Sequence, residues 1–272
     1  MSAGPTGGWP AFDRLLGALG FVPSRTGSVI TTVYGDAILP RGGSLALADL
    51  LVLMRRLGAS DGVVRTAVSR LARDGVLAGR RTGRTSAYAL TERSRVAFAA
   101  AVPVIYGSPD RDWDGVLHLL FPEDPAERAA LERPGVAVLA PGVLVSLDPV
   151  DGAAALRATG GVAEQRRLAA RAWPADGLAA EFAGFMGDFA VLEEEQAPSP
   201  LDAMAARITV VHAYRRLALR TPRLPAVLRP EGWPGDAAFQ RFRGVYRGLL
   251  PLSEGWLDQV GSGSGPLPPR AA

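Results

Sequence analysis

Polar side chains with the chemistry to contact DNA bases recur between Ser60 and Gly75 at the spacing of one helix face. The apolar stripe of this segment, formed by Val64, Val68 and Leu71, lies on the opposite face. An arginine can form paired hydrogen bonds with guanine, and a hydroxyl can contact bases or phosphates. The segment predicts a recognition helix for a major groove, although an ordinary solvated helix has the same pattern. The face in question carries Arg65, Thr66, Ser69 and Arg73, with Arg70 beside them.

A basic β-hairpin is expected directly after this helix. The runs VLAGRR and TSAYALT have the composition of two short strands, and Thr82 and Gly83 join them. A helix-turn-helix followed by such a hairpin is a winged helix, in which the hairpin contacts phosphates or the minor groove. The combination favours DNA binding over a merely solvated helix. The arginines assigned to this contact are Arg80, Arg81 and Arg84.

Two further helices are expected to position the recognition helix. The run SVITTVYGDAIL predicts a helix that Gly35 interrupts, with Ser24 as its N-cap. Ser44 is expected to cap the second helix, LALADLLVLMRRLG, whose leucines recur at helical spacing until Gly58 ends it. Ser60 then begins the recognition helix itself.

Charge is distributed unevenly along the 272 residues. Residues 25–95 hold 12 arginines against five acids, a net charge of +7, whereas residues 96–200 carry −9 and residues 201–272 carry +5. All 30 basic residues are arginine, so the abundance of arginine by itself does not indicate DNA binding. The inference depends on how the arginines are distributed along the chain. A strongly basic first segment attracts a polyanion, because each arginine can neutralise a phosphate.

Composition excludes several protein classes. With 48% hydrophobic and 21% charged residues, the chain is expected to be a soluble globular protein with a sizeable core. The absence of cysteine excludes disulfide frameworks, thiolate metal sites and cysteine nucleophiles. No apolar run approaches the roughly 20 residues that span a bilayer, and the first residues lack a signal-peptide pattern. We therefore expect a cytoplasmic protein with no membrane partner.

The N-terminal pattern resembles that of the PaaX family, the phenylacetic acid catabolon repressors. That family has a GDAI-PRGG element, an LVRT-V-RL-EGW helix and an R-GR-S-Y-LT wing. The chain is also similar to the family's C-terminal domain, with its His-x-Tyr-Arg helix, Pro-x-Leu-Pro turn and Trp-Pro-Gly element, so the resemblance covers most of residues 25–257. The residues that match the N-terminal elements are Gly35, Asp36, Pro40, Arg41, Gly42, Gly43, Val64, Arg65, Thr66, Val68, Arg70, Leu71, Gly75, Gly83, Arg84, Tyr88, Leu90 and Thr91.

The middle of the chain is expected to form a ferredoxin-like α+β domain. The runs VLHLLFP, PEDPAERAALE and VAVLAPGVLVSLD predict a strand, a helix and a strand pair. Trp113, Asp114 and Gly115 match the family's Trp-Asp-Gly element, and its Pro-Gly-Val element follows at Pro141, although Leu144 stands where an aromatic residue often follows. The resemblance implies a middle domain related in fold to a CRISPR adaptation nuclease.

That relationship draws attention to Asp110, Asp112 and Asp114, which could together hold a divalent cation. A calcium loop that begins at Asp110 would need a glutamate at its twelfth position, where Phe121 stands instead. We therefore expect a solvated acidic loop and no metal.

A catalytic site is not expected either. Two histidines, His118 and His212, are the only imidazoles of the chain, and neither belongs to an evident set of nucleophile, base and orienting acid. Phosphate-binding loops and nucleophile elbows are also missing. The sequence predicts no catalytic residues, no cofactor and a protein that is not an enzyme.

The expected fold class is α+β in three domains. A winged helix-turn-helix is expected at residues 24–95, a ferredoxin-like domain with linker helices at 96–200 and a mostly helical domain at 201–260. An N-terminal extension, residues 1–23, carries an apolar patch that can dock as a short helix or fray. Residues 261–272 have the composition of a flexible tail.

The resemblance implies a ligand-responsive repressor that binds a near-palindromic operator in double-stranded DNA as a homodimer. PaaX proteins are released by phenylacetyl-coenzyme A, so an aromatic acyl-CoA effector and control of aromatic acid (phenylacetate) catabolism genes are implied. Such a ligand needs aromatic walls and a basic rim. The alternative is that Trp233 and Phe239 are core and the arginines pair with the acidic middle segment. The candidate ligand residues are His212, Tyr214, Arg215, Arg216 and Trp233.

Two other hypotheses stay open on the sequence alone. The first is a metal-dependent nuclease built on the middle domain, which Asp114→Ala would inactivate. The second is an acyl-CoA-binding module that no longer uses its DNA surface.

Overall fold

The computed structural model describes residues 8–20, 25–82, 85–133 and 135–261 and contains both helices and strands, which confirms the predicted α+β class. The chain divides into two compact units, each built from separate segments. The first unit comprises Met1–Gly107, Gly184–Arg216 and Gln240–Ala272, and the second comprises Ser108–Ala183 and Leu217–Phe239. These units follow packing and not chain order, so they differ from the ranges 96–200 and 201–260 expected for two separate domains.

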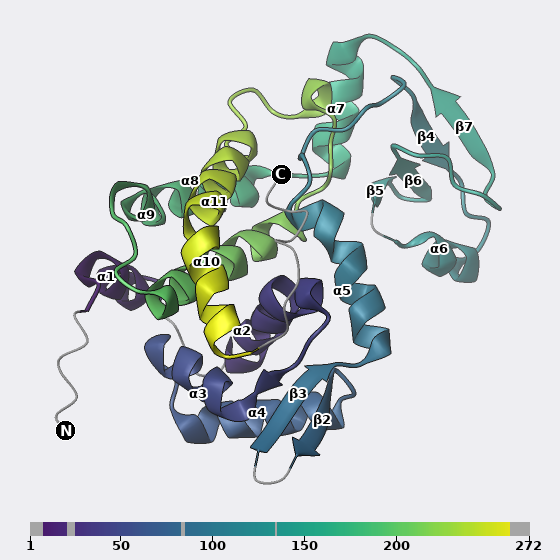
Figure 1. Cartoon of the computed structure of the whole chain (residues 1–272). Helices are drawn as coiled ribbons and strands as arrows, with labels where there is room; N and C mark the ends of the chain where they lie inside the picture. Colours follow the sequence, from purple (N-terminus) through teal and green to yellow (C-terminus); the bar gives the residue numbers. More distant parts are fainter. Residues whose placement is uncertain (1–7, 21–24, 83–84, 134, 262–272) are drawn as a thin grey trace, which may run out of the picture. The chain divides into compact units, whose positions relative to one another are not determined.

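Three helices and a small antiparallel sheet form the N-terminal part of the first unit (Figure 1). The sheet has the order β1-β3-β2, and the recognition helix expected between Ser60 and Gly75 is α4. This arrangement agrees with the winged helix-turn-helix expected from the sequence. The elements are α2 (Thr26–Val33), the π-helical turn η2 (Tyr34–Ile38), the 3-10 turn η3 (Leu39–Arg41), β1 (Leu45–Ala46), α3 (Leu47–Arg56), α4 (Asp61–Arg73), β2 (Leu77–Thr82) and β3 (Thr85–Leu90).

The start of the second helix differs from the prediction. Ser44 does not cap it, because Leu45 and Ala46 are extended and pair with Tyr88 and Ala87 of β3. Leu45 is fully buried in that pairing, so helix α3 begins only at Leu47 with Ala46 as its N-cap. Tertiary pairing therefore overrides the local capping signal of Ser44. The expected cap Ser24 lies outside the described residues.

Gly35 lies inside η2, as its predicted interruption of the first helix suggested. A Cβ atom at this position would overlap the ring of Phe98 on α5 (Glu92–Ile105), so the close approach of these two elements requires glycine. Thr82 belongs to β2 and pairs with Thr85, so it is a strand residue and not part of the turn in which the sequence had suggested it.

The apolar patch of the N-terminal extension docks as helix α1 (Pro10–Ala18). Trp9, Phe12 and Leu15 are buried, and Trp9 donates from Nε1 to Glu195 Oε2 at 2.9 Å, just after the short helix α9 (Val191–Glu194). These contacts hold α1 in the first unit.

Long helices complete the first unit, as expected for the C-terminal region: parts of α8 (Asp176–Asp188), α10 (Pro200–Ala218) and α11 (Gly235–Gln259), together with α5. Their aromatic side chains form the core, in which Tyr214 stacks on Phe242 with ring centroids 4.2 Å apart. Tyr246 packs 5.8 Å from Phe242, and Tyr106 lies 5.5 Å from Tyr246. Among the described residues, no helix has the length and apolar character to span a membrane.

The second unit contains a four-stranded antiparallel sheet with the order β5-β6-β4-β7. This order and these directions agree with the expected ferredoxin-like sheet, but the second crossover, from β6 to β7, is a loop without a helix in it. Helix α7 instead follows the fourth strand and packs on the sheet around Leu117 and Val145. The elements are β4 (Leu117–Leu120), α6 (Pro125–Leu131), β5 (Val136–Ala140), β6 (Val143–Ser146), β7 (Ala155–Ala158), α7 (Val162–Ala172) and the 3-10 turn η4 (Ala226–Leu228).

Candidate nucleic-acid interface

Helix α4 exposes the polar face that the sequence predicts. Val64, Val68 and Leu71 are buried on its inner side, against α2 and α3. Ser60 occupies the N-cap position, although its side chain makes no capping hydrogen bond there. Asp61 in the first turn accepts from Arg55 Nε at 2.7 Å, which ties the start of α4 to the end of α3. The exposed residues of α4 include all five predicted contacts: Arg65, Thr66, Ser69, Arg70 and Arg73.

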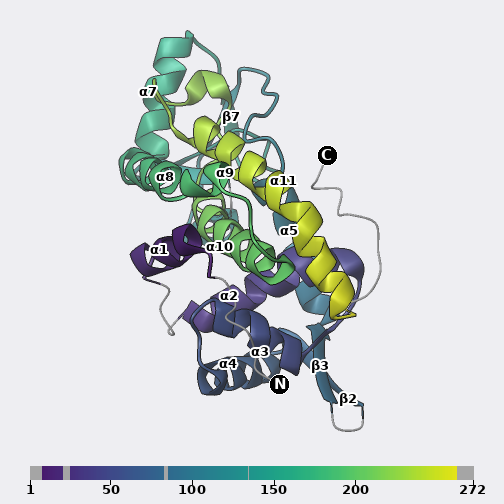
Figure 2. The same cartoon turned by 60° about the vertical axis from the view of Figure 1, so that its left-hand side comes forward.

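The β2–β3 hairpin projects from the same end of the unit as α4 (Figures 1 and 2). Arg80 and Arg81 are exposed on β2, where they pair in register with Ala87 and Ser86. Successive strand residues point to opposite faces, so these two arginines lie on opposite faces of the hairpin. Arg84, the third predicted contact of the wing, lies outside the described residues. The described geometry thus places two exposed cations at the end of the unit that also holds α4.

A buried ionic cluster joins this region to the C-terminal helices of the same unit. Arg207 on α10 donates from Nε to Asp36 Oδ2 at 2.7 Å and from Nη1 to Glu254 Oε1 at 2.5 Å. Burial alone would lower the pKa of Arg207, but Asp36, Tyr246 and Glu254 outweigh it and hold the pKa above its ordinary value. Tyr106 and Tyr246 donate to the second oxygen of Asp36 at 2.6 and 3.1 Å. The buried acid therefore has a partner for each oxygen.

Arg41 extends this cluster to the surface. Its Nε and Nη2 donate to Glu254 Oε2 at 2.9 and 2.6 Å, and its Nη1 donates to Asp258 at 2.8 Å. Asp36 and Arg41 were visible in the sequence as matches to the GDAI-PRGG element. Arg207 and Glu254 were missed, because they are 171 and 218 residues from Asp36 and no local pattern connects them.

The structure places the five predicted ligand residues in different surroundings within the two units. Tyr214 is a core residue whose ring also lies 5.6 Å from Phe185. Trp233 belongs to the second unit, where it packs edge-on against Phe182 at 5.4 Å. Arg215 donates to Thr32 Oγ1 at 2.8 Å and so ties α10 to α2. The remaining two residues, His212 and Arg216, do line a common pocket.

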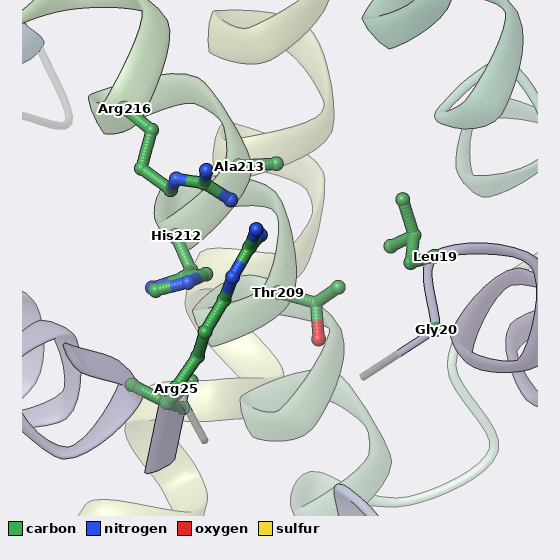
Figure 3. A pocket seen from close by; sticks show the side chains of 8 residues that line it. Leu19, Gly20, Arg25, Thr209, His212, Ala213 and Arg216 are labelled. Carbon is green, nitrogen blue, oxygen red and sulfur yellow. The ribbon is translucent and has the colours of Figure 1, made fainter. Parts of the chain in front are cut away.

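This pocket lies where α1, α2 and α10 meet in the first unit (Figure 3). It has a volume of about 70 Å³. His212 is 7% exposed, and its Nδ1 lies 3.0 Å from Thr32 Oγ1. Burial, with added repulsion from Arg215, Arg216 and Arg25, lowers the pKa of His212 to about 3, so the ring is neutral at pH 7. The described lining residues are Leu19, Gly20, Arg25, Val29, Thr209, His212, Ala213 and Arg216.

The acidic loop of the second unit makes structural contacts. Asp110 Oδ1 accepts from the Ala226 amide at 3.0 Å and lies 3.3 Å from Arg229 Nη2. Asp114 Oδ1 accepts from the Val116 amide at 3.0 Å, and Asp112 is exposed. Within the part of the chain that the structure describes, no three histidines or acids gather as metal ligands would.

The chain resembles known proteins over almost its whole length. Residues 25–94 match the family described as PaaX-like protein, and residues 173–259 match the PaaX-like protein C-terminal domain. The chain is also 30% identical over 281 aligned residues to the transcriptional repressor PaaX of Escherichia coli (strain K12). The alignment covers 92% of this chain and 89% of that relative.

Proposed function

Because the chain belongs to the PaaX family, we propose that it is a transcriptional repressor that binds double-stranded DNA through α4 and the β2–β3 hairpin. The observation that carries this proposal is the exposed face of α4. It combines arginines, a serine and a threonine with two hairpin arginines at the same end of one unit. In this mode α4 enters the major groove and reads base edges, while Arg80 and Arg81 neutralise phosphates beside it.

The repressor acts as a homodimer on a near-palindromic operator. Two recognition helices then enter successive major grooves about 34 Å apart, one turn of the duplex, or a small multiple of that distance. Bound across a promoter, the dimer blocks transcription.

An aromatic acyl-CoA such as phenylacetyl-CoA is the proposed effector, and genes of aromatic acid catabolism are the proposed targets. The support for both is the resemblance to a family of phenylacetic acid catabolon repressors, together with the basic pocket around His212 and Arg216. To release DNA, the effector must bind the released conformation more tightly than the DNA-bound one, because equal affinity shifts no population.

Fluorescence anisotropy with a duplex from the gene's own upstream region tests the proposal. We expect tight binding that weakens steeply between 50 and about 200 mM salt and that exceeds binding to a random duplex. Reversal by phenylacetyl-CoA would support the effector, and indifference to it would remove the effector but keep the repressor. Equal affinity for the upstream and random duplexes would contradict the proposed function.

A further inference from the structure

The pocket around His212 is basic, and its lining residues are not part of the proposed DNA-binding surface. It is lined by two arginines from different helices, a buried imidazole and a threonine, and none of its described lining residues is acidic. We propose that this pocket binds a phosphate group of a small-molecule ligand, which Arg25 and Arg216 hold between them.

The two arginines approach the pocket from opposite elements. Arg25 occupies the N-cap position of α2, and Arg216 lies in the last turn of α10. In Figure 3 their guanidinium groups point toward one another above His212 and Thr209. Two like charges in this arrangement repel each other, and a dianion between them turns the repulsion into two charge-assisted pairs. A phosphate matches two guanidinium groups in charge, whereas a carboxylate supplies only one negative charge.

His212 contributes a neutral polar group to the floor of the pocket. Arg215 donates to Thr32 Oγ1, so the hydroxyl proton of Thr32 points away from Arg215, toward either His212 Nδ1 or the Ser28 carbonyl oxygen. When the proton lies on the side of Nδ1, the hydrogen of the neutral ring is on Nε2, where it can donate to an anion. In that tautomer the imidazole adds a directional hydrogen bond without a third positive charge.

The size of the pocket decides which part of a ligand it can hold. Its volume of about 70 Å³ is several times the roughly 10–15 Å³ of accessible space that one buried water needs. That space suits a small anionic group such as a phosphate and is too small for a whole coenzyme A thioester. Any larger ligand therefore anchors here by its phosphate and extends outside the pocket.

A phosphate in this place would act on the helix that supports the recognition helix. Arg25 directly precedes α2, which packs against α4, and Arg216 belongs to α10. Bridging the two arginines strengthens the link between α2 and α10 that Arg215 already makes. This regulatory role rests on the proposed function, whereas binding of phosphate does not.

Calorimetric titration of the full-length protein with inorganic phosphate, against sodium chloride of equal ionic strength, tests the pocket. We expect Arg25→Gln and Arg216→Gln each to lower the phosphate affinity at least tenfold. Arg14→Gln is the matched control, because it removes the same charge from an exposed position on α1 and should leave the affinity within twofold. Heat equal to the chloride blank, or unchanged affinity in both pocket variants, would overturn the proposal.

Two further measurements, displacement of phosphate by a random duplex and binding of the upstream duplex, distinguish failure of the pocket proposal from failure of the proposed function. A random duplex that displaces phosphate from the protein would assign the pocket to the DNA backbone and overturn a small-molecule site. If phosphate binding fails while the upstream duplex still binds, only the pocket proposal is wrong. If phosphate binds but the upstream duplex does not, the proposed function is wrong and the pocket stands.

Discussion

Arg207 and Asp36 form an ion pair that is almost completely removed from solvent, with 0% and 1% of their side-chain surfaces exposed. Asp36 lies in the turn that follows the first helix of the winged domain, and Arg207 lies in the middle of α10. An ion pair so deeply buried is retained only where its geometry satisfies both charges. The pair thus fixes how the winged-domain helices meet the C-terminal helices within the first unit.

Removal of one partner should destabilise the protein strongly. Arg207→Leu leaves Asp36 buried without its cation and leaves Glu254 paired with Arg41 alone, and we expect a loss of about 3–5 kcal/mol in the free energy of unfolding. Urea denaturation followed by circular dichroism measures this loss. As a control, Arg167→Leu removes an exposed arginine paired with Glu164 and should cost less than about 1 kcal/mol. A loss for Arg207→Leu no larger than that of the control would contradict the assigned role of the pair.

The close approach of Gly35 to Phe98 gives a second stability prediction. Gly35→Ala introduces a Cβ that overlaps the ring, and we expect a cost of about 1–3 kcal/mol in the free energy of unfolding. The double variant Gly35→Ala/Phe98→Ala removes the overlap, so its loss should be smaller than the sum of the two single losses. If the loss in the double variant equalled the sum of the two single losses, this double-mutant cycle would show that the two residues do not interact.

Base recognition should depend on the exposed face of α4. Arg65→Ala and Ser69→Ala should each reduce the preference for the upstream duplex over a random one, and loss of a paired arginine contact costs about 1–3 kcal/mol. Competition anisotropy with single-base variants of the operator measures the change. If Arg65→Ala altered neither affinity nor preference, α4 would not be the recognition helix.

The hairpin arginines should act on affinity and not on base preference. Arg80→Ala with Arg81→Ala should weaken binding to all duplexes nearly equally and reduce the slope of log K against log salt by about 0.9 for each phosphate that is no longer neutralised. Anisotropy at several salt concentrations gives that slope. A changed base preference with an unchanged slope would assign these arginines to base contacts instead.

Protonation of His212 should make the fold less stable in mild acid. Its pKa is lowered from the ordinary 6.5 to about 3, with burial first and the charges of Arg215, Arg216 and Arg25 next as causes. Below pH 6.5 the imidazole of His212 becomes protonated in the unfolded chain but stays neutral in the folded chain. The free energy of unfolding therefore decreases as the pH falls toward 3. Among the described residues, the groups that face the ring include these three arginines and the hydroxyl of Thr32.

His212→Asn should remove this dependence. Between pH 7 and 5.5, where carboxylates stay largely ionised, we expect wild type to lose about 1 kcal/mol more than the variant. Urea denaturation of both proteins at the two pH values measures the difference. Equal losses in the two proteins would mean that His212 titrates normally in the folded state.

Local patterns in the sequence were enough to predict α4 and the hairpin. The apolar stripe at Val64, Val68 and Leu71 repeats at helical spacing, and the two strand-like runs flank a two-residue turn, so both elements are encoded within about thirty residues. The same patterns identified the arginines that the structure leaves exposed. Ser44 misled the prediction, because the pairing of Leu45 with Tyr88 draws on a strand more than 40 residues away.

Which polar residues gather at one place was decided by the tertiary structure. Tyr214 and Trp233 have the chemistry of ligand walls, yet packing places one in an aromatic core and the other in the second unit. Arg25 received no role from the sequence, although it lines the pocket with Arg216. The physical reason is that helix and turn signals depend on neighbours within a few residues, whereas a buried ion pair or a pocket depends on side chains whose separation in the chain carries no pattern.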